Sequence, residues 1–164
     1  MNYAFRRARE TEILAIFDLY VRRVRWMDEV GICQWNRTDY LSAYPQAYYR
    51  EELQKGNLFV LEDEAGTLCG AVVLLRQDER WAGCAAQRAL YVHNLVADRK
   101  AKGAGKTILR KTECLARESG LQAVRLDCAA ENETLNAWYE EQGYLPAGTC
   151  AEGPYFGRLR EKRL

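Results

Sequence analysis

The chain has 164 residues, of which 48% are hydrophobic and 29% are charged, and its formal net charge is +1. This length fits a single domain over residues 1–164 that buries roughly two thirds of its unfolded surface. The nearly balanced charge argues against a broad polyanion-binding surface, so we expect no nucleic-acid partner.

The N-terminal third predicts a strand followed by two helices. A short strand covers residues 3–8. Apolar side chains then recur at helical spacing from Ile13 to Val24, which predicts an amphipathic helix. Thr38 or Asp39 begins a second helix, and Pro45 is expected to break or kink it.

A β-hairpin and a polar loop are predicted next. Residues 57–62 and 68–76 are largely apolar and predict the two strands, and an acidic turn with a glycine separates them. Residues 77–88 are polar and predict a loop. The apolar run from Leu90 to Val96 then has the length of a buried strand, and Ile108 to Ser119 predicts a helix.

A basic glycine loop joins that strand to that helix: Lys100-Ala101-Lys102-Gly103-Ala104-Gly105-Lys106-Thr107. The glycines allow close backbone approach, and the first N–H groups of a helix have no internal partners and lie at the positive end of its dipole. Three lysines add positive charge at the same point. The expected ligand therefore carries phosphates.

Two familiar phosphate motifs do not fit this loop. A P-loop needs glycine where Lys100 stands, and a dinucleotide fingerprint needs glycine in place of Ile108. The pattern that fits is basic-x-x-G-x-G, formed by Lys100, Gly103 and Gly105. A plain lysine-rich turn would show the same local sequence, so the loop alone leaves both interpretations open.

The next segment adds a second part to the pattern. Val124–Cys128 predicts a buried strand, Asn132 follows it, Tyr139 lies in the succeeding helix, and Gly143-Tyr144 closes that helix. Together with the loop, this order and spacing resembles the GCN5-related N-acetyltransferase (GNAT) superfamily. Those enzymes usually carry Gln or Arg at the position of Lys100.

The likeness covers nearly the whole chain. Gln34-Trp35, Tyr44-Pro45 and Arg125-Leu126-Asp127-Cys128 are similar to one bacterial subgroup of the superfamily. Residues 145–150 and 155–159 predict two final strands, so strands and helices interleave as in an α/β or α+β protein. The resemblance implies the GNAT fold, a mixed central sheet of about six to seven strands, splayed at the acetyl-CoA site and flanked by about four helices.

The resemblance also implies an N-acetyltransferase that moves an acetyl group from acetyl-CoA to a primary amine by direct transfer in a ternary complex. The residues that it assigns to the acetyl-CoA site are Leu95, Val96, Lys100, Lys102, Gly103, Ala104, Gly105, Lys106, Thr107, Asn132, Asn136 and Tyr139. Tyr139 is also the candidate that donates a proton to the departing thiolate. The alternative is a helix tyrosine that packs in the core.

The general base is less obvious. Many members of the superfamily carry a Glu on the strand before the glycine loop, where this chain offers Leu90, Val92 and Asn94 on the side expected to face the acceptor. His93 has the opposite parity from those residues, so we expect it to point away from the acceptor side and to pack in the core.

Asp127 is the better candidate for the base, because some superfamily enzymes that acetylate protein N-termini carry a catalytic Glu at the same spacing from the Asn and the Tyr. An ion pair with Arg125 or Arg158 is its alternative role. Cys128 has no neighbouring histidine in the sequence, so a covalent cysteine intermediate is not expected.

The resemblance places the acceptor beside the first two helices and their loop. The candidate residues are Trp26, Gln34, Trp35, Tyr40, Tyr44 and, from the strand, Asn94. Aromatic walls suit a small amine or amino-acid-like molecule better than a protein N-terminus, although they would also suit a core. A non-catalytic acetyl-CoA sensor or interaction domain is the alternative function, and a homodimer is left open.

The remaining signals are negative. Six scattered cysteines without a C-x-x-C pair, and a single histidine, predict no metal site. Residues 1–7 lack the apolar core of a signal peptide, so we expect a cytoplasmic protein with reduced thiols and no membrane partner.

Overall fold

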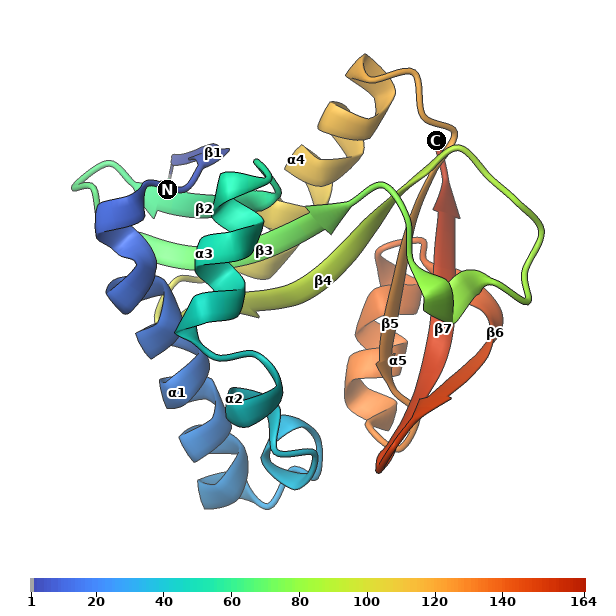
Figure 1. Ribbon diagram of the computed structural model, residues 1–164, viewed down its shortest axis with the longest axis horizontal. Helices are drawn as coiled ribbons and strands as arrows, with labels where there is room; N and C mark the ends of the chain where they lie inside the picture. The colour runs from blue at the N-terminus through green and yellow to red at the C-terminus, as the bar shows by residue number, and fades with distance from the viewer. Residues whose placement is uncertain (1) are drawn as a thin grey trace.

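The computed structural model describes residues 2–164, which form one mixed sheet flanked by helices (Figure 1). The strands are β1 (Tyr3–Arg7), β2 (Leu58–Asp63), β3 (Leu68–Leu75), β4 (Ala89–Ala97), β5 (Ala123–Ala129), β6 (Leu145–Glu152) and β7 (Tyr155–Arg163). The α-helices are α1 (Ile13–Val30), α2 (Tyr40–Ala43), α3 (Gln46–Gln54), α4 (Ala104–Glu118) and α5 (Glu133–Glu141).

This architecture confirms the predicted α/β fold with seven strands. The helices of the described residues number five rather than about four, because the predicted second helix is split at Pro45 into α2 and α3. None of the helices in the described part of the chain is long and apolar enough to cross a membrane.

The sheet opens between its two middle strands. The strand order is β1-β2-β3-β4-β5-β7-β6, and only β4 and β5 are parallel. They pair from Ala89 and Ala123 as far as Val92 and Leu126, and beyond that point they diverge (Figure 1). The helix α4 connects them on one face of the sheet. The carboxyl-terminal halves of β4 and β5 are therefore free to border a ligand.

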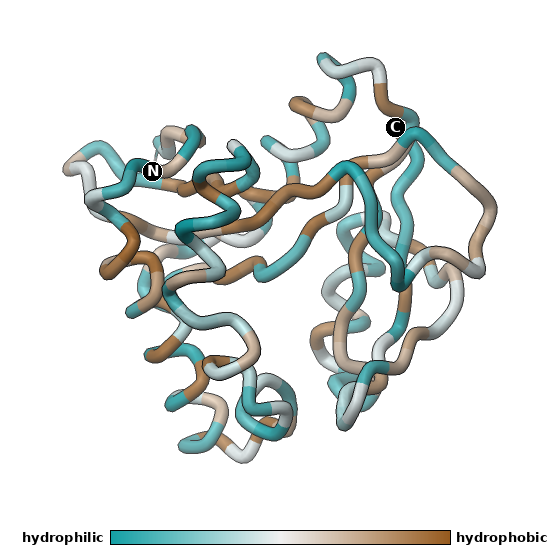
Figure 2. The backbone as a smooth tube through the Cα atoms, in the orientation of Figure 1, coloured by the Kyte–Doolittle hydropathy of each residue, from teal (hydrophilic) through white to brown (hydrophobic). Residues whose placement is uncertain are grey.

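Two hydrophobic layers cover the two faces of the sheet. On one face, α4 and α5 pack over Leu90 and Val92 of β4. On the other face, α1 and α3 pack over Val73 and Val96. Figure 2 shows the hydrophobic stretches concentrated along the central strands β2 to β4. The strands that border the opening are thus anchored on both sides.

A bulge interrupts β4 at Asn94. His93 pairs with Val73 of β3, and Val96 pairs with Ala71. Three residue steps along β4 therefore lie opposite two along β3, which is a β-bulge. Asn94 has a φ of 51°, in the left-handed region. This conformation costs about 1–3 kcal/mol in a residue other than glycine.

Three tyrosines hold the bulge in place. Tyr20 Oη donates a hydrogen bond of 2.6 Å to the Asn94 carbonyl, and Tyr48 Oη donates one of 2.9 Å to its Oδ1. The Asn94 amide in turn donates to the Tyr40 hydroxyl. At about 0.5–1.5 kcal/mol each, these bonds offset the backbone strain.

Candidate active site

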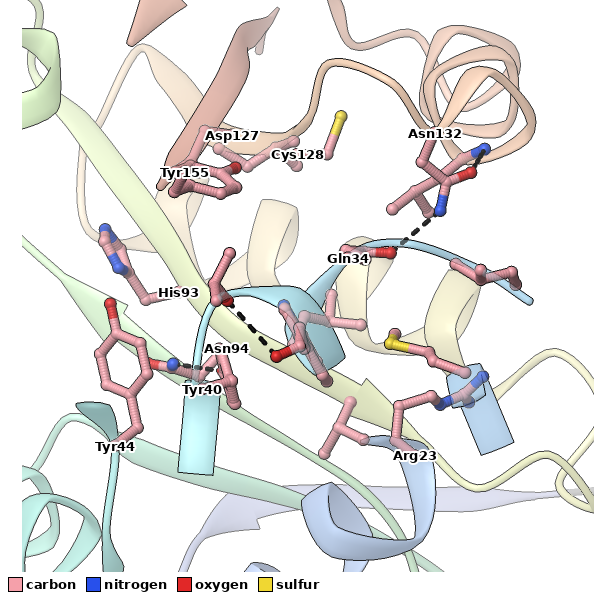
Figure 3. Close-up of a pocket in the computed structure, with 18 of the residues that line it drawn as sticks. Arg23, Gln34, Tyr40, Tyr44, His93, Asn94, Asp127, Cys128, Asn132 and Tyr155 are labelled. Atoms are coloured by element: carbon pink, nitrogen blue, oxygen red, sulfur yellow. Dashed lines mark hydrogen bonds between the residues drawn. The ribbon is translucent and has the colours of Figure 1, made fainter. Parts of the chain in front are cut away.

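A cavity of about 770 Å³ lies where β4 and β5 separate. Its walls come from α1 and the loop after it, α2, β4, β5, α5 and the turn between β6 and β7 (Figure 3). This volume falls in the range of about 300–1,000 Å³ that is typical of small-molecule sites. The opening of the sheet therefore holds a site of ligand size.

The residues expected to bind acetyl-CoA fall into two groups. Five of them line the cavity: Leu95, Val96, Gly105, Asn132 and Tyr139. Apart from Asn136, the others lie in the glycine loop and the first turn of α4: Lys100, Lys102, Gly103, Ala104, Lys106 and Thr107. In this segment, Gly105 is the residue that lines the cavity.

The glycine loop fits a phosphate group. Gly103 has a φ of 75°, and among the described residues no acceptor meets the amides of Lys102, Gly103, Gly105 and Lys106. The three lysines of the loop are exposed around these amides. Free N–H donors at the start of a helix, surrounded by cations, are suited to the pyrophosphate of coenzyme A.

Asn136 lies outside the cavity lining, contrary to its expected contact with the cofactor. Its amide donates hydrogen bonds of 2.9 Å to the carbonyls of Ala129 and Asn132. Its Oδ1 accepts from Cys128 and from the buried Arg160. All the polar atoms of the Asn136 side chain make hydrogen bonds that connect α5 to the rest of the fold, so Asn136 has a structural role.

Tyr139 lines the cavity from α5 and is only 6% exposed. Among the described residues its hydroxyl has no hydrogen-bond partner, and it is not one of the atoms sealed from solvent. Burial raises the pKa of Tyr139, and the nearby Cys128 and Asp127 raise it further. The phenol therefore keeps its proton at neutral pH and is free to donate it into the cavity.

Asp127 lies at the opposite side of the cavity from Asn132 (Figure 3). Tyr155 Oη donates a hydrogen bond of 2.6 Å to its Oδ2, and the Arg80 guanidinium lies 3.3 Å from its Oδ1. Asp127 thus makes an ion pair, the alternative role considered for it, but its partner is Arg80 and not Arg125 or Arg158. Arg80 and Tyr155 together occupy both carboxylate oxygens and fix the orientation of the Asp127 side chain.

His93 is where the prediction from strand parity is wrong. His93 keeps the opposite parity from Leu90 and Val92, but those two residues pack in the α4 layer, so the His93 ring lines the cavity. The bulge follows His93 and brings Asn94 to the cavity as well. The ring nitrogen Nε2 lies 2.7 Å from Oδ2 of Asp78. Figure 3 shows His93 on the same side of the cavity as Asp127 and Tyr155.

The six residues predicted for the acceptor side all line the cavity: Trp26, Gln34, Trp35, Tyr40, Tyr44 and Asn94. Trp35 stacks on Tyr40 with ring centres 4.3 Å apart. Gln34 Oε1 accepts a hydrogen bond of 2.9 Å from Asn132, which joins the loop after α1 to the start of α5 across the cavity (Figure 3).

Sequence reasoning missed Arg80 and Tyr155, and it misjudged His93. Arg80 lies in the polar loop, within a short 3-10 turn, Glu79–Trp81, and Tyr155 begins β7. Neither residue belongs to a motif. The one available signal was that His93 is the single histidine of the chain and lies within a largely apolar strand segment.

Comparison with known proteins agrees with this geometry. The model of the acetyltransferase (GNAT) family matches residues 30–144. The uncharacterised N-acetyltransferase YesJ of Bacillus subtilis (strain 168) is 26% identical over 146 residues, which cover 85% of this chain and 79% of that protein.

Solved structures share the whole fold. A GNAT-family acetyltransferase from Listeria monocytogenes is 30% identical, with a TM-score of 0.81 over 99% of this chain and 95% of that one. PaiA N-acetyltransferase of Thermoplasma acidophilum, solved with coenzyme A, has a TM-score of 0.74 over 100% of both chains. It is 16% identical, so this second likeness concerns the fold alone.

The chain belongs to the GNAT family of acetyltransferases. It is an acetyl-CoA-dependent N-acetyltransferase, with acetyl-CoA as its co-substrate, as the resemblance implied.

Proposed function

We propose that this enzyme acetylates the primary amine of a small cationic molecule by direct transfer in a ternary complex. The observation that carries the proposal is the charge at the acceptor end of the cavity. Asp127 and Glu152 line it, Asp78 lies behind His93, and Arg80 is the one guanidinium among them. With His93 neutral, this end has two excess negative charges, which favour an ammonium group.

The aromatic wall supports the same class of acceptor. Trp35, Tyr40 and Tyr44 pack against one another along the cavity. Aromatic faces attract ammonium groups and also bury the apolar part of a small amine. In this arrangement Asp127 holds the ammonium beside the thioester by its charge.

Tyr139 completes the transfer in our proposal. Bound acetyl-CoA supplies a thioester whose carbonyl carbon accepts the amine. The Tyr139 phenol donates a proton to the departing sulfur, since its hydroxyl is free and protonated.

The environment of Cys128 supports direct transfer over a cysteine intermediate. Burial raises the pKa of its thiol to about 11, and the thiol contacts Asn136 Oδ1 at 3.2 Å. A protonated, hydrogen-bonded thiol is a poor nucleophile at neutral pH.

A panel of amines tests the proposal through the release of free CoA thiol. Diamines and other small cations should react with kcat/KM at least about tenfold above those of zwitterionic amino acids and of peptides with a free N-terminus, equivalent to about 1.4 kcal/mol. A preference for peptides would contradict the acceptor class. Acetyl-CoA binding without any turnover would instead favour the sensor function.

A further inference from the structure

The single histidine of the chain has no part in the transfer described so far, although it lines the cavity. The His93 side chain is 11% exposed, and Asp78 Oδ2 lies 2.7 Å from its Nε2. Burial alone would raise the pKa of Asp78, but the hydrogen bond and charge of His93 and donors of Arg80 lower it. Asp78 is therefore a carboxylate, which can only accept, and Nε2 carries the shared proton.

The other ring nitrogen is available to a ligand. Among the described residues Nδ1 of His93 has no hydrogen-bond partner, and it is not one of the atoms sealed from solvent. The ring lines the large cavity and does not line a second cavity of about 390 Å³, which Asp78 borders. A neutral imidazole protonated on Nε2 holds its lone pair on Nδ1, as a base requires.

We propose that His93 is the general base of the reaction and that Asp78 positions it. The proposal rests on the function proposed above. His93 Nδ1 takes one proton from the acceptor ammonium, which frees the nitrogen lone pair. The new C–N bond forms as the C–S bond breaks, the second N–H proton ends on the sulfur through Tyr139, and the first passes to water. One ammonium and one acetyl-CoA thus give one amide, one CoA thiol and one H⁺.

Acidic side chains gather around His93. One carboxylate oxygen of Asp78, one of Asp127 and one ring nitrogen of His93 all lie within 4.8 Å of one another. The titratable groups around the ring, from every element that packs there, are Asp78, Arg80, Asp127, Cys150, Glu152, Tyr155, Tyr44 and Tyr48. Three carboxylates against one guanidinium leave this end of the cavity with an excess of negative charge, which attracts the acceptor ammonium towards His93.

Asp127 is less suited to remove the proton. Both of its oxygens already accept hydrogen bonds, from Arg80 and Tyr155, whereas His93 Nδ1 is free. The two residues therefore differ in role: Asp127 attracts the ammonium and His93 deprotonates it. Variants of the two residues should differ in their pH dependence.

The first test compares His93→Gln and Asp127→Asn with the wild type across pH, using the best amine of the panel. His93→Gln should lower kcat/KM roughly 10²-fold or more at neutral pH and remove an ionisation from the acidic limb. Asp127→Asn should keep that ionisation. Retention of the limb by His93→Gln, or its loss in Asp127→Asn, would overturn the proposal.

The second test needs no variant of His93 and so does not depend on its folding. Because the chain has one histidine, its imidazole gives a single Hε1 resonance by NMR. The titration midpoint of that resonance should coincide with the kinetic midpoint of kcat/KM, and Asp78→Asn should move both together. Separate midpoints would overturn the role of His93. Absence of turnover by the wild type on every amine would instead refute the function on which it rests.

Discussion

The Tyr155 hydroxyl donates a 2.6 Å hydrogen bond to Oδ2 of Asp127, and this bond joins β7 to β5 at the acceptor end of the cavity. Asp127 and Tyr155 are 28 residues apart in the chain. Arg80 approaches the same carboxylate from the polar loop. The carboxylate is therefore fixed in orientation by two donors from different parts of the fold.

Asp127→Asn should raise the acceptor KM by about tenfold or more while leaving acetyl-CoA affinity unchanged, because it removes one negative charge from the acceptor end. Steady-state kinetics and calorimetry measure the two effects. Tyr155→Phe is the matched control, since it removes a donor but keeps the charge, and its acceptor KM should change less. An unchanged acceptor KM in Asp127→Asn would contradict a charge-holding role.

Tyr139→Phe should lower kcat by roughly 10²-fold, since the phenol that protonates the leaving sulfur is lost, with nearly unchanged acetyl-CoA affinity. Tyr144→Phe is the control, because the buried Tyr144 hydroxyl donates a 3.1 Å hydrogen bond to Glu113 Oε1. That variant should lose about 0.5–1.5 kcal/mol of stability and keep its kcat. Equal kcat values for Tyr139→Phe and wild type, with chemistry rate-limiting, would return Tyr139 to a packing role.

Gly105→Val should abolish acetyl-CoA binding with the fold retained. A Cβ at Gly105 would stand 3.6 Å from Trp138 and 3.8 Å from Ala97, an ordinary contact distance, so the protein tolerates it. The branched side chain would occupy the place of the pyrophosphate.

Isothermal calorimetry and a melting curve check this pair of effects. Gly83→Val is the control, because a Cβ there meets no atom within 4 Å and lies outside the glycine loop. Lys100→Ala should weaken binding only modestly, since backbone amides carry the phosphate contact. Wild-type affinity in Gly105→Val would refute the position of the phosphate.

Cys128 should resist alkylation at pH 7.5, while the exposed Cys33 and Cys114 react. Its pKa of about 11 keeps the thiol protonated below that pH, and reactivity should rise only as the pH approaches this value. Peptide mapping after iodoacetamide treatment measures the order. Cys128→Ser should retain turnover within about threefold, whereas complete loss of activity in a folded protein would revive the covalent route.

The sequence was sufficient for the fold because its signals are local. The glycine loop, the apolar strands beside it and the position of Asn132 each depend on neighbours in the chain. Asn132 indeed caps α5 through a 3.0 Å bond from the Leu135 amide. The pattern that predicts the acetyl-CoA residues is equally local; five of these residues line the cavity, whereas Asn136 does not.

The acceptor end depends on features that the sequence does not show. Strand parity places His93 opposite Leu90 and Val92 but does not say which face of β4 borders the cavity, and the bulge at Asn94 then breaks the parity that Asn94 would share with Val92. The bulge itself depends on tyrosines that lie as far as 74 residues away. Likewise, Arg80 reaches Asp127 across 47 residues from a loop with no recognisable motif. Such contacts follow from the packed fold and not from spacing.

Because β4 and β5 pair over a short segment, a ligand bound between them would also affect the stability of the sheet. Backbone hydrogen bonds join the two halves of the sheet over the segments Ala89–Val92 and Ala123–Leu126, with one more from the Gln122 amide to the Arg88 carbonyl just before them. A ligand seated between the diverging strands would bridge those halves. Saturation at 100 times its dissociation constant would add about 2.7 kcal/mol to the free energy of unfolding. A shortage of acetyl-CoA would then lower both the free energy of unfolding of the enzyme and its rate of turnover.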